Sequence, residues 1–176
     1  MAPLSNAGIR RLCERLNAEL RRIDVVGEVF LVGGAVMCLV HEARPSTQNI
    51  DAVFRSADAV REAARRTGLA RGIGVHWLNH AVKGFMSERG DFAPCLELDH
   101  LRVMTAQRQY LLAMKCLAMR IGAEFHGEEN VRFRPRLREV RSYEQAVRTI
   151  TKDYPLDGFP QETRYALQDL RPKRTH

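Results

Sequence analysis

Two neighbouring stretches decide the fold of this chain: Leu31-Val32-Gly33-Gly34-Ala35-Val36-Met37 and Asn49-Ile50-Asp51-Ala52-Val53-Phe54. The first is apolar on both sides of a glycine pair, which is typical of a buried strand that turns into a short helix. The second predicts a strand, in which alternate side chains point to opposite faces of a sheet. Asn49 and Asp51 should therefore share one face, while Ile50 and Ala52 point into the sheet.

Length and composition fit one well-buried domain with a small helical addition. The chain has 176 residues, of which 45% are hydrophobic. We expect an α/β core over residues 1–104 and a helical C-terminal part over 105–176, packed as one structural unit. No apolar run approaches the roughly 20 residues of a membrane span, and the amino terminus lacks a secretory pattern, so we expect a cytoplasmic protein without a membrane partner. The four cysteines form no Cys-x-x-Cys pair, which favours buried thiols.

The chain is basic, with 28 Lys and Arg against 21 Asp and Glu and a formal charge of +7. This charge favours a polyanion or a phosphate-rich ligand as partner, and a solvated basic surface is the alternative.

Periodicity and capping residues predict the remaining elements. Strands are expected at Val29 to Val32, Ile50 to Phe54 and Leu96 to Val103, with a loop from Arg44 to Thr47. Helices are expected at Ile9 to Ile23, at Ala35 to His41, from the N-cap Ser56 through Arg66 with Gly68 ending it, from Thr105 as cap over Gln107 to Ile121, from Ser142 to Pro155, and over Pro160 to Leu170. This order predicts an α/β (α+β) fold, a mixed sheet flanked by helices.

The order of elements resembles the nucleotidyltransferase superfamily, and most closely its bacterial abortive-infection (AbiEii-like) branch, whose members are toxins of toxin and antitoxin pairs. The resemblance runs from about Val29 to Leu170. Its specific pieces are Leu31 to Phe54, the stretch Trp77-Leu78-Asn79-His80-Ala81-Val82-Lys83-Gly84-Phe85, the stretch Tyr110-Leu111-Leu112-Ala113-Met114-Lys115, and Tyr154-Pro155.

The resemblance implies a site for a nucleoside triphosphate and its magnesium ion. Gly33 and Gly34 match the turn whose backbone approaches the phosphates, and Thr47 is taken with them as nucleotide-binding. An Asp-x-Asp pair holds magnesium in the family; Asp51 matches its second carboxylate, and Asn49 stands at the first. Lys115 matches a helix lysine near phosphate.

An amide carries no charge, so magnesium affinity should fall with Asn at position 49. A third carboxylate usually comes from a neighbouring strand, and Glu97 is the candidate, with Asp99 as the fallback. Further acidic positions also differ: His80 stands where the family commonly has Asp, and Gly127-Glu128-Glu129-Asn130 replaces an Asp-x-x-Asp sequence.

Two functions follow as expectations. An active member would transfer a nucleoside monophosphate from a triphosphate to an RNA end, such as transfer RNA, or to a protein side chain, and an antitoxin would be its partner. The alternative is a catalytically degenerate binding module for a nucleotide, RNA or a protein partner.

Each residue also has a structural interpretation. The glycine pair is alternatively a tight turn, Asp51 a surface acid and Lys115 a solvated helix residue. His76 and His80 have the spacing of paired zinc ligands, but Trp77 stands where a metalloprotease helix needs its glutamate, so zinc hydrolysis is rejected. The alternating arginines of 132–138 fit either an RNA backbone or solvent.

Overall fold

The structure is a computed structural model that describes residues 3–42, 45–117 and 143–155, and it has the mixed α/β content that the sequence predicts. The chain divides into two compact units, Met1–Gly84 with Phe92–Gln107, and Phe85–Asp91 with Arg108–His176. The predicted boundary at 104/105 falls inside strand β7, and the short segment Phe85–Asp91 groups with the second unit.

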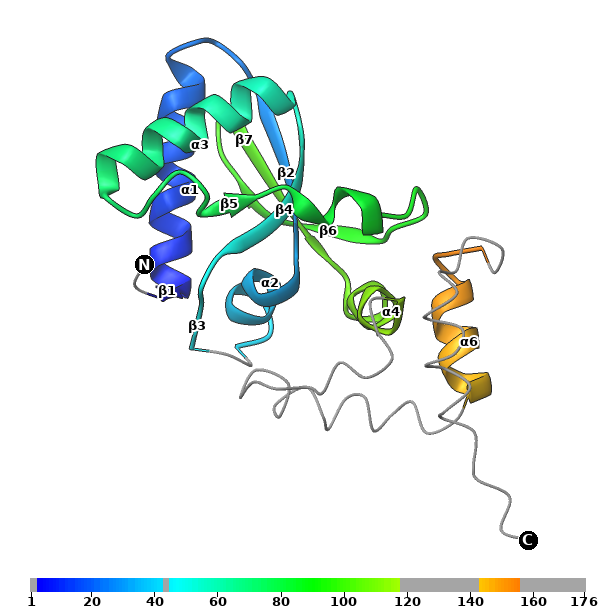
Figure 1. Cartoon of the computed structure of the whole chain (residues 1–176). Coiled ribbons are helices and arrows are strands. Elements are labelled where there is room, and N and C mark those ends of the chain that lie inside the picture. Colours follow the sequence, from blue (N-terminus) through cyan, green and yellow to red (C-terminus); the bar gives the residue numbers. More distant parts are fainter. Residues whose placement is uncertain (1–2, 43–44, 118–142, 156–176) are drawn as a thin grey trace, which may run out of the picture. The chain divides into compact units, whose positions relative to one another are not determined.

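The first unit contains a five-stranded mixed sheet in the order β5-β4-β2-β7-β6 (Figure 1). Central β2 pairs antiparallel with β4 and parallel with β7, β4 pairs parallel with β5, and β6 pairs antiparallel with β7. The strands are β2 (Gly27–Val32), β4 (Ile50–Arg55), β5 (Leu78–Asn79), β6 (Phe92–Glu97) and β7 (Leu101–Ala106). A separate antiparallel pair joins β1 (Leu4–Ser5) to β3 (Ser46–Thr47), so the predicted loop at Arg44 to Thr47 contains a short strand.

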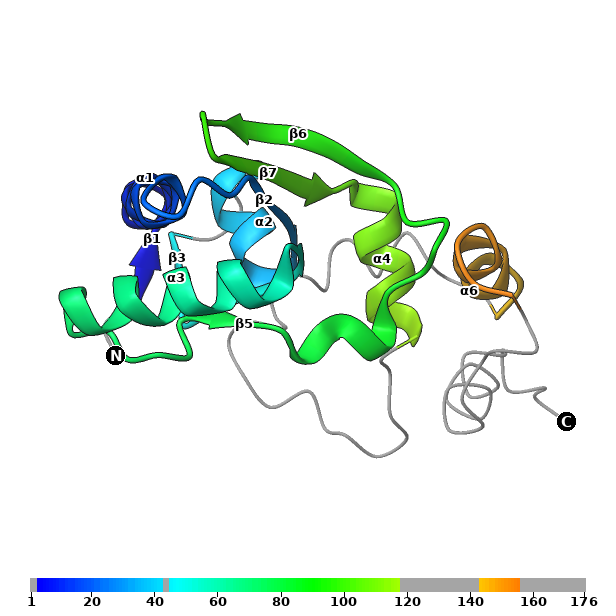
Figure 2. The same ribbon diagram turned by 90° about the horizontal axis from the view of Figure 1, so that it is seen from above.

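Two long helices pack side by side on one face of this sheet, α1 (Asn6–Arg21) and α3 (Ala57–Arg71) (Figure 2). A β-carbon at Gly27 would lie 2.7 Å from Val60 and 3.0 Å from Leu20, which shows how closely both helices approach β2. The alternate strand residues of this face are almost fully buried and form the core; they include Val29, Leu31, Ala52, Leu101 and Val103.

The opposite face of the sheet is only half-buried at its centre. Phe30 meets Phe92 edge-on at 5.3 Å between ring centroids, and the Arg55 guanidinium lies 5.3 Å from the Phe30 centroid. Asp51 belongs to this face too, since it pairs with Val32, two residues along β2 from Phe30. The sequence predicted this alternation correctly.

The predicted strand Leu96 to Val103 is wrong, because a tight turn interrupts it. Leu98 N donates to Leu101 O at 2.9 Å, so β6 and β7 form a hairpin. The apolar residues Leu96, Leu98, Leu101 and Val103 shift phase at the polar pair Asp99-His100, a sign of the turn that the sequence prediction overlooked. Thr105 accordingly lies in β7, where its hydroxyl donates to Ala93 O at 3.4 Å, and it caps no helix.

Helix α3 differs from the prediction at both ends. Ser56 precedes the helix with φ 56°, but its hydroxyl donates to Val26 O at 3.1 Å and does not cap. Gly68 does not end the helix, which continues to Arg71 and ends at Gly72 with φ 64°. Gly68 serves packing, since a β-carbon there would lie 2.2 Å from Gly74 O.

Short helices complete the first unit, α2 (Gly33–Leu39) and the 3-10 helix η1 (Ala81–Phe85), which reaches the start of the second unit. Helix α2 begins at the glycine pair and ends before the predicted His41. Cys13 and Cys38 are buried reduced cysteines, as expected, and Cys95 is half-buried.

The second unit contains α4 (Arg108–Leu117) and α6 (Tyr143–Thr151), which contact each other. Tyr110 and Tyr154 stack at 6.1 Å, and the Tyr110 hydroxyl accepts a hydrogen bond from Ser87 N at 2.8 Å. Helix α6 ends at Thr151 and does not reach Pro155. The predictions for residues 118–121, for the Ser142 cap and for Pro160 to Leu170 lie outside the described residues.

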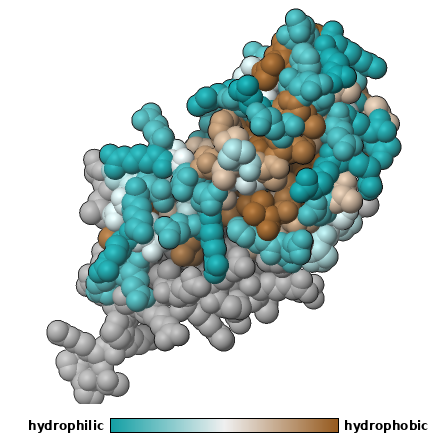
Figure 3. All heavy atoms as spheres, turned by 180° about the vertical axis from the view of Figure 1, so that it is seen from behind, coloured by the Kyte–Doolittle hydropathy of each residue, from teal (hydrophilic) through white to brown (hydrophobic). Residues whose placement is uncertain are grey.

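Among the described helices, none is long and apolar enough to cross a membrane. Hydrophilic side chains cover much of the face that Figure 3 shows, with hydrophobic side chains gathered between them.

Candidate functional site

Asp51 is the centre of the candidate site and the second residue of β4, where it pairs with Val32 of β2 and Asn79 of β5. Asn49 lies just before β4, and its Nδ2 donates to Asp51 Oδ1 at 3.5 Å. The predicted juxtaposition of Asn49 and Asp51 is therefore confirmed. Ile50, between the two, and Ala52, which follows Asp51, are buried, with 1% and 0% of their surface exposed.

Asn79 is the third polar side chain of the site, and the sequence analysis missed it. Its Nδ2 donates to Asp51 Oδ1 at 3.0 Å. Strand β5 has only two residues, so no alternating pattern reveals it. The one available signal was that Trp77-Leu78-Asn79 belongs to the stretches that resemble the family. In the structure, parallel pairing of β5 with β4 places Asn79 directly beside Asp51.

The glycine turn faces the same carboxylate. Gly33 has φ +62°, in the left-handed region that favours glycine, and a β-carbon there would lie 3.3 Å from Asp51 Oδ2. Gly34 follows it in the first turn of α2. The prediction that Asp51 lies against the glycine pair is confirmed.

Thr47 contacts the backbone of Asn49 and has a structural role there. It is buried, with 5% of its surface exposed, and its hydroxyl donates to Asn49 O at 3.0 Å. This bond fixes the backbone that presents Asn49 to Asp51. Its predicted contact with a nucleotide stays a prediction.

Glu97 is not brought to Asp51, so the predicted metal pair does not form. Glu97 pairs with Arg102 of β7, and Arg102 pairs with Glu28 of β2. Asp51 pairs with Val32 of β2, which lies four residues from Glu28. Glu97 and Asp51 are therefore displaced by about 13 Å along the strand direction. The cause is the unforeseen hairpin, which puts Glu97 at the far end of the sheet, 3.9 Å from Arg102. The fallback Asp99 lies in the hairpin turn and forms an ion pair with Arg21.

Lys115 lies on α4 of the second unit. Its predicted role near phosphate stays a prediction.

The donors around Asp51 do not fit a catalytic magnesium centre. They comprise one carboxylate and two amides, and both amide nitrogens donate to that carboxylate. Magnesium is usually held by one or two carboxylates together with substrate phosphates and waters, and here both amide donors occupy lone pairs of the one carboxylate oxygen Oδ1. Within residues 3–42, 45–117 and 143–155, no group of three or more His, Cys, Asp or Glu side chains could hold a metal ion.

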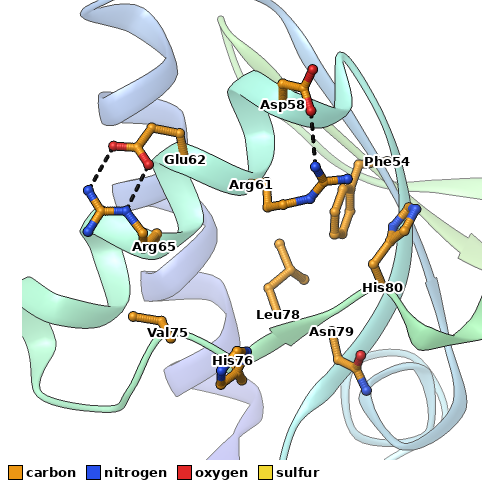
Figure 4. Close-up of a pocket in the computed structure, with 10 residues that line it drawn as sticks. All are labelled: Phe54, Asp58, Arg61, Glu62, Arg65, Val75, His76, Leu78, Asn79 and His80. Carbon is orange, nitrogen blue, oxygen red and sulfur yellow. Dashed lines mark hydrogen bonds and ion pairs between the residues drawn. The ribbon is translucent and has the colours of Figure 1, made fainter.

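A cavity of about 440 Å³ lies on the other side of β5, between that strand and α3 (Figure 4). Leu78 and His80 point toward it, and Asn79 also belongs to its lining. The His80 ring lies 4.4 Å from the Phe54 ring, tilted by 40°. Burial lowers the pKa of the His80 imidazole, and the charges of Arg61 and Lys83 lower it further.

Comparisons of the chain with protein-family models, with curated proteins and with solved structures gave no match. The geometry around Asp51 and the cavity beside β5 are therefore the evidence on function.

Proposed function

We propose that the chain is a nucleotidyltransferase-like protein that binds a nucleotide at the Gly33 turn and Asp51 but does not transfer it. The proposal combines the motif resemblance of the sequence with the local geometry of the first unit. The carrying observation is that Asn79 and Asn49 both donate to Asp51 Oδ1, at 3.0 and 3.5 Å.

These hydrogen bonds affect binding and chemistry differently. Two amide donors disperse the negative charge of Asp51, so they reduce its repulsion of a phosphate group at the nearby turn. The absence of a side chain at Gly33 leaves room for that phosphate to approach the backbone. Phosphoryl transfer, however, depends on metal ions that neutralise the triphosphate, and the donor set does not suit one.

The test compares binding with transfer in the whole chain. We expect adenosine and guanosine triphosphates to bind in calorimetric titrations, with the same affinity in magnesium and in EDTA. Labelled triphosphates mixed with total transfer RNA or cell extract should leave no label on either RNA or protein. Label transfer that Asp51→Asn abolishes would overturn the proposal, and so would the absence of binding.

Added carboxylates provide a second comparison. Asn49→Asp with Asn79→Asp adds two negative charges beside Asp51, so triphosphate binding should become magnesium-dependent. A single Asn17→Asp change, on α1, adds one charge outside the site and should leave binding metal-independent.

A second candidate is the active nucleotidyltransferase, because Asp51 Oδ2 still faces the Gly33 turn as the resemblance implies. In that reaction, an acceptor hydroxyl forms a bond to the α-phosphorus of the triphosphate. The bond to the β-phosphate bridging oxygen breaks, pyrophosphate leaves and the hydroxyl proton passes to solvent. The label-transfer assay separates the two candidates directly.

A further inference from the structure

The cavity beside β5 plays no part in the proposed function. Its apolar wall contains Phe54, Leu78 and Val75, and its opposite wall is the polar face of α3. On that face, Arg61 pairs with Asp58 at 3.0 Å and Arg65 pairs with Glu62 at 2.8 and 2.9 Å. The hydrophobic part of a ligand could thus contact one wall of the cavity while a charged group of the same ligand contacts the opposite wall (Figure 4).

The charged residues that line this cavity form two ion pairs, Arg61 with Asp58 and Arg65 with Glu62, so the lining has no net charge of its own. Glu62 also accepts a hydrogen bond from Arg66 at 2.9 Å, so one carboxylate is shared between two arginines. Helix α3 as a whole carries four arginines and two acids, a net charge of +2. An anionic group near Arg65 would therefore enter a positive field that Glu62 only partly neutralises.

His80 adds a group that responds to an anion. Its Nδ1 is buried and has no hydrogen-bond partner among the described residues. The groups around the ring are the cations Arg61 and Lys83, the Phe54 ring and the Ala52 backbone, whose hydrogen bond with the imidazole raises its pKa, with Asp58 also on the cavity wall. An anion beside Arg61 would offset the positive charges that oppose protonation of the imidazole.

We propose that this cavity binds a small ligand that joins a flat aromatic body to an anionic group, the chemistry of a nucleoside monophosphate. The body would lie on the Phe54 and Leu78 wall, and the anionic group would face Arg61 and Arg65. A volume of about 440 Å³ is that of a typical small-molecule site. Asp51 and Gly33 are not among the residues that line the cavity, although Asn79, which donates to Asp51, is.

The protein contains its own probe of the cavity. Trp77 is the single tryptophan of the chain, lies between the cavity residues His76 and Leu78, and donates from Nε1 to Ala64 O at 2.8 Å. We would titrate the full chain with adenosine 5′-monophosphate and with adenosine while recording Trp77 fluorescence. The monophosphate should bind about tenfold more tightly, since a charge-assisted hydrogen bond distinguishes the two probes.

Imidazole titration by NMR provides the second measurement. Saturating monophosphate should raise the pKa of His80, whereas adenosine should not. The proposal would be overturned if neither adenosine 5′-monophosphate nor adenosine bound saturably. It would also be overturned if both bound with the same affinity and left the same His80 pKa.

Two arginines supply the matched variants. Arg65 and Arg66 both bind Glu62, but only Arg65 lines the cavity. Arg65→Gln should weaken monophosphate binding about tenfold, and Arg66→Gln, which removes a charge outside the cavity lining, should weaken it much less. Equal losses would contradict the site. Asp51→Asn should leave this binding intact; if that variant alone loses it, the monophosphate occupies the Asp51 site, which supports the proposed function and overturns this one.

Discussion

Single backbone angles control how closely other groups approach the candidate site. Gly33 and Gly72 have nearly the same left-handed φ, +62° and +64°. A β-carbon at Gly33 would lie 3.3 Å from Asp51 Oδ2, whereas one at Gly72 would have no atom within 4 Å. The two glycines therefore separate backbone strain from contact with the site.

We predict that Gly33→Ala and Gly72→Ala each lower the free energy of unfolding by about 1–2 kcal/mol, the cost of a left-handed alanine. Only Gly33→Ala should also weaken triphosphate binding, because its methyl group enters the space between the turn and Asp51. Urea denaturation and calorimetric titration measure the two effects. Unchanged binding in Gly33→Ala would show that no ligand approaches this turn.

At the scale of elements, helix α3 is fixed to β5 through one interior glycine. Gly68 approaches Gly74 O so closely that a β-carbon would lie 2.2 Å from that oxygen and 2.9 Å from the Trp77 ring. Gly8 in α1 differs, since its nearest neighbour would be Ser5 Oγ at an ordinary 3.4 Å. Helix propensity alone favours alanine at both positions.

We predict opposite signs for the two substitutions. Gly8→Ala should raise the free energy of unfolding by up to about 1 kcal/mol through helix propensity. Gly68→Ala should lower it by about 1–3 kcal/mol, because the backbone carbonyl of Gly74 must move. Chemical denaturation followed by circular dichroism measures both. A stabilising Gly68→Ala would mean that α3 and the Gly74 turn do not pack as described.

At the scale of the whole molecule, the two units contain titratable groups with opposite pKa shifts. Burial lowers the pKa of His80 in the first unit from its ordinary value of 6.5. Its contribution to stability is therefore present above pH 6.5 and is lost as the pH falls through the lowered pKa. In the second unit, burial and the charge of Asp91 raise the pKa of Asp153 above 3.8. That contribution is present below pH 3.8 and is lost as the pH rises through the raised pKa.

We predict that Asp153→Asn stabilises the chain at neutral pH, where the natural side chain is charged and buried. The gain should shrink as the pH is lowered through the raised pKa and vanish below the ordinary value of 3.8. His80→Gln should instead flatten the loss of stability on acidification below 6.5. Urea denaturation across the pH range measures both variants, and a pH-independent gain for Asp153→Asn would contradict the assignment.

The sequence by itself determined the parts of the first unit that depend on local periodicity. Helix α1, strands β2 and β4, and the turn at Gly33 follow from alternation, helical spacing and glycine, which act within a few residues. Strand alternation also predicted that Asn49 and Asp51 share one face, and the 3.5 Å hydrogen bond between their side chains confirms it.

Only the tertiary structure decided what surrounds Asp51. The hairpin between β6 and β7 carried Glu97 to the far end of the sheet, and the two-residue strand β5 brought Asn79 to 3.0 Å from the carboxylate. Asn79 was not predictable from local patterns, because two residues contain no period; the hairpin did leave a local sign, the polar pair Asp99-His100 that breaks the alternation. The pairing of strands that are distant in sequence decides which side chains lie beside Asp51, and local sequence patterns do not contain that information.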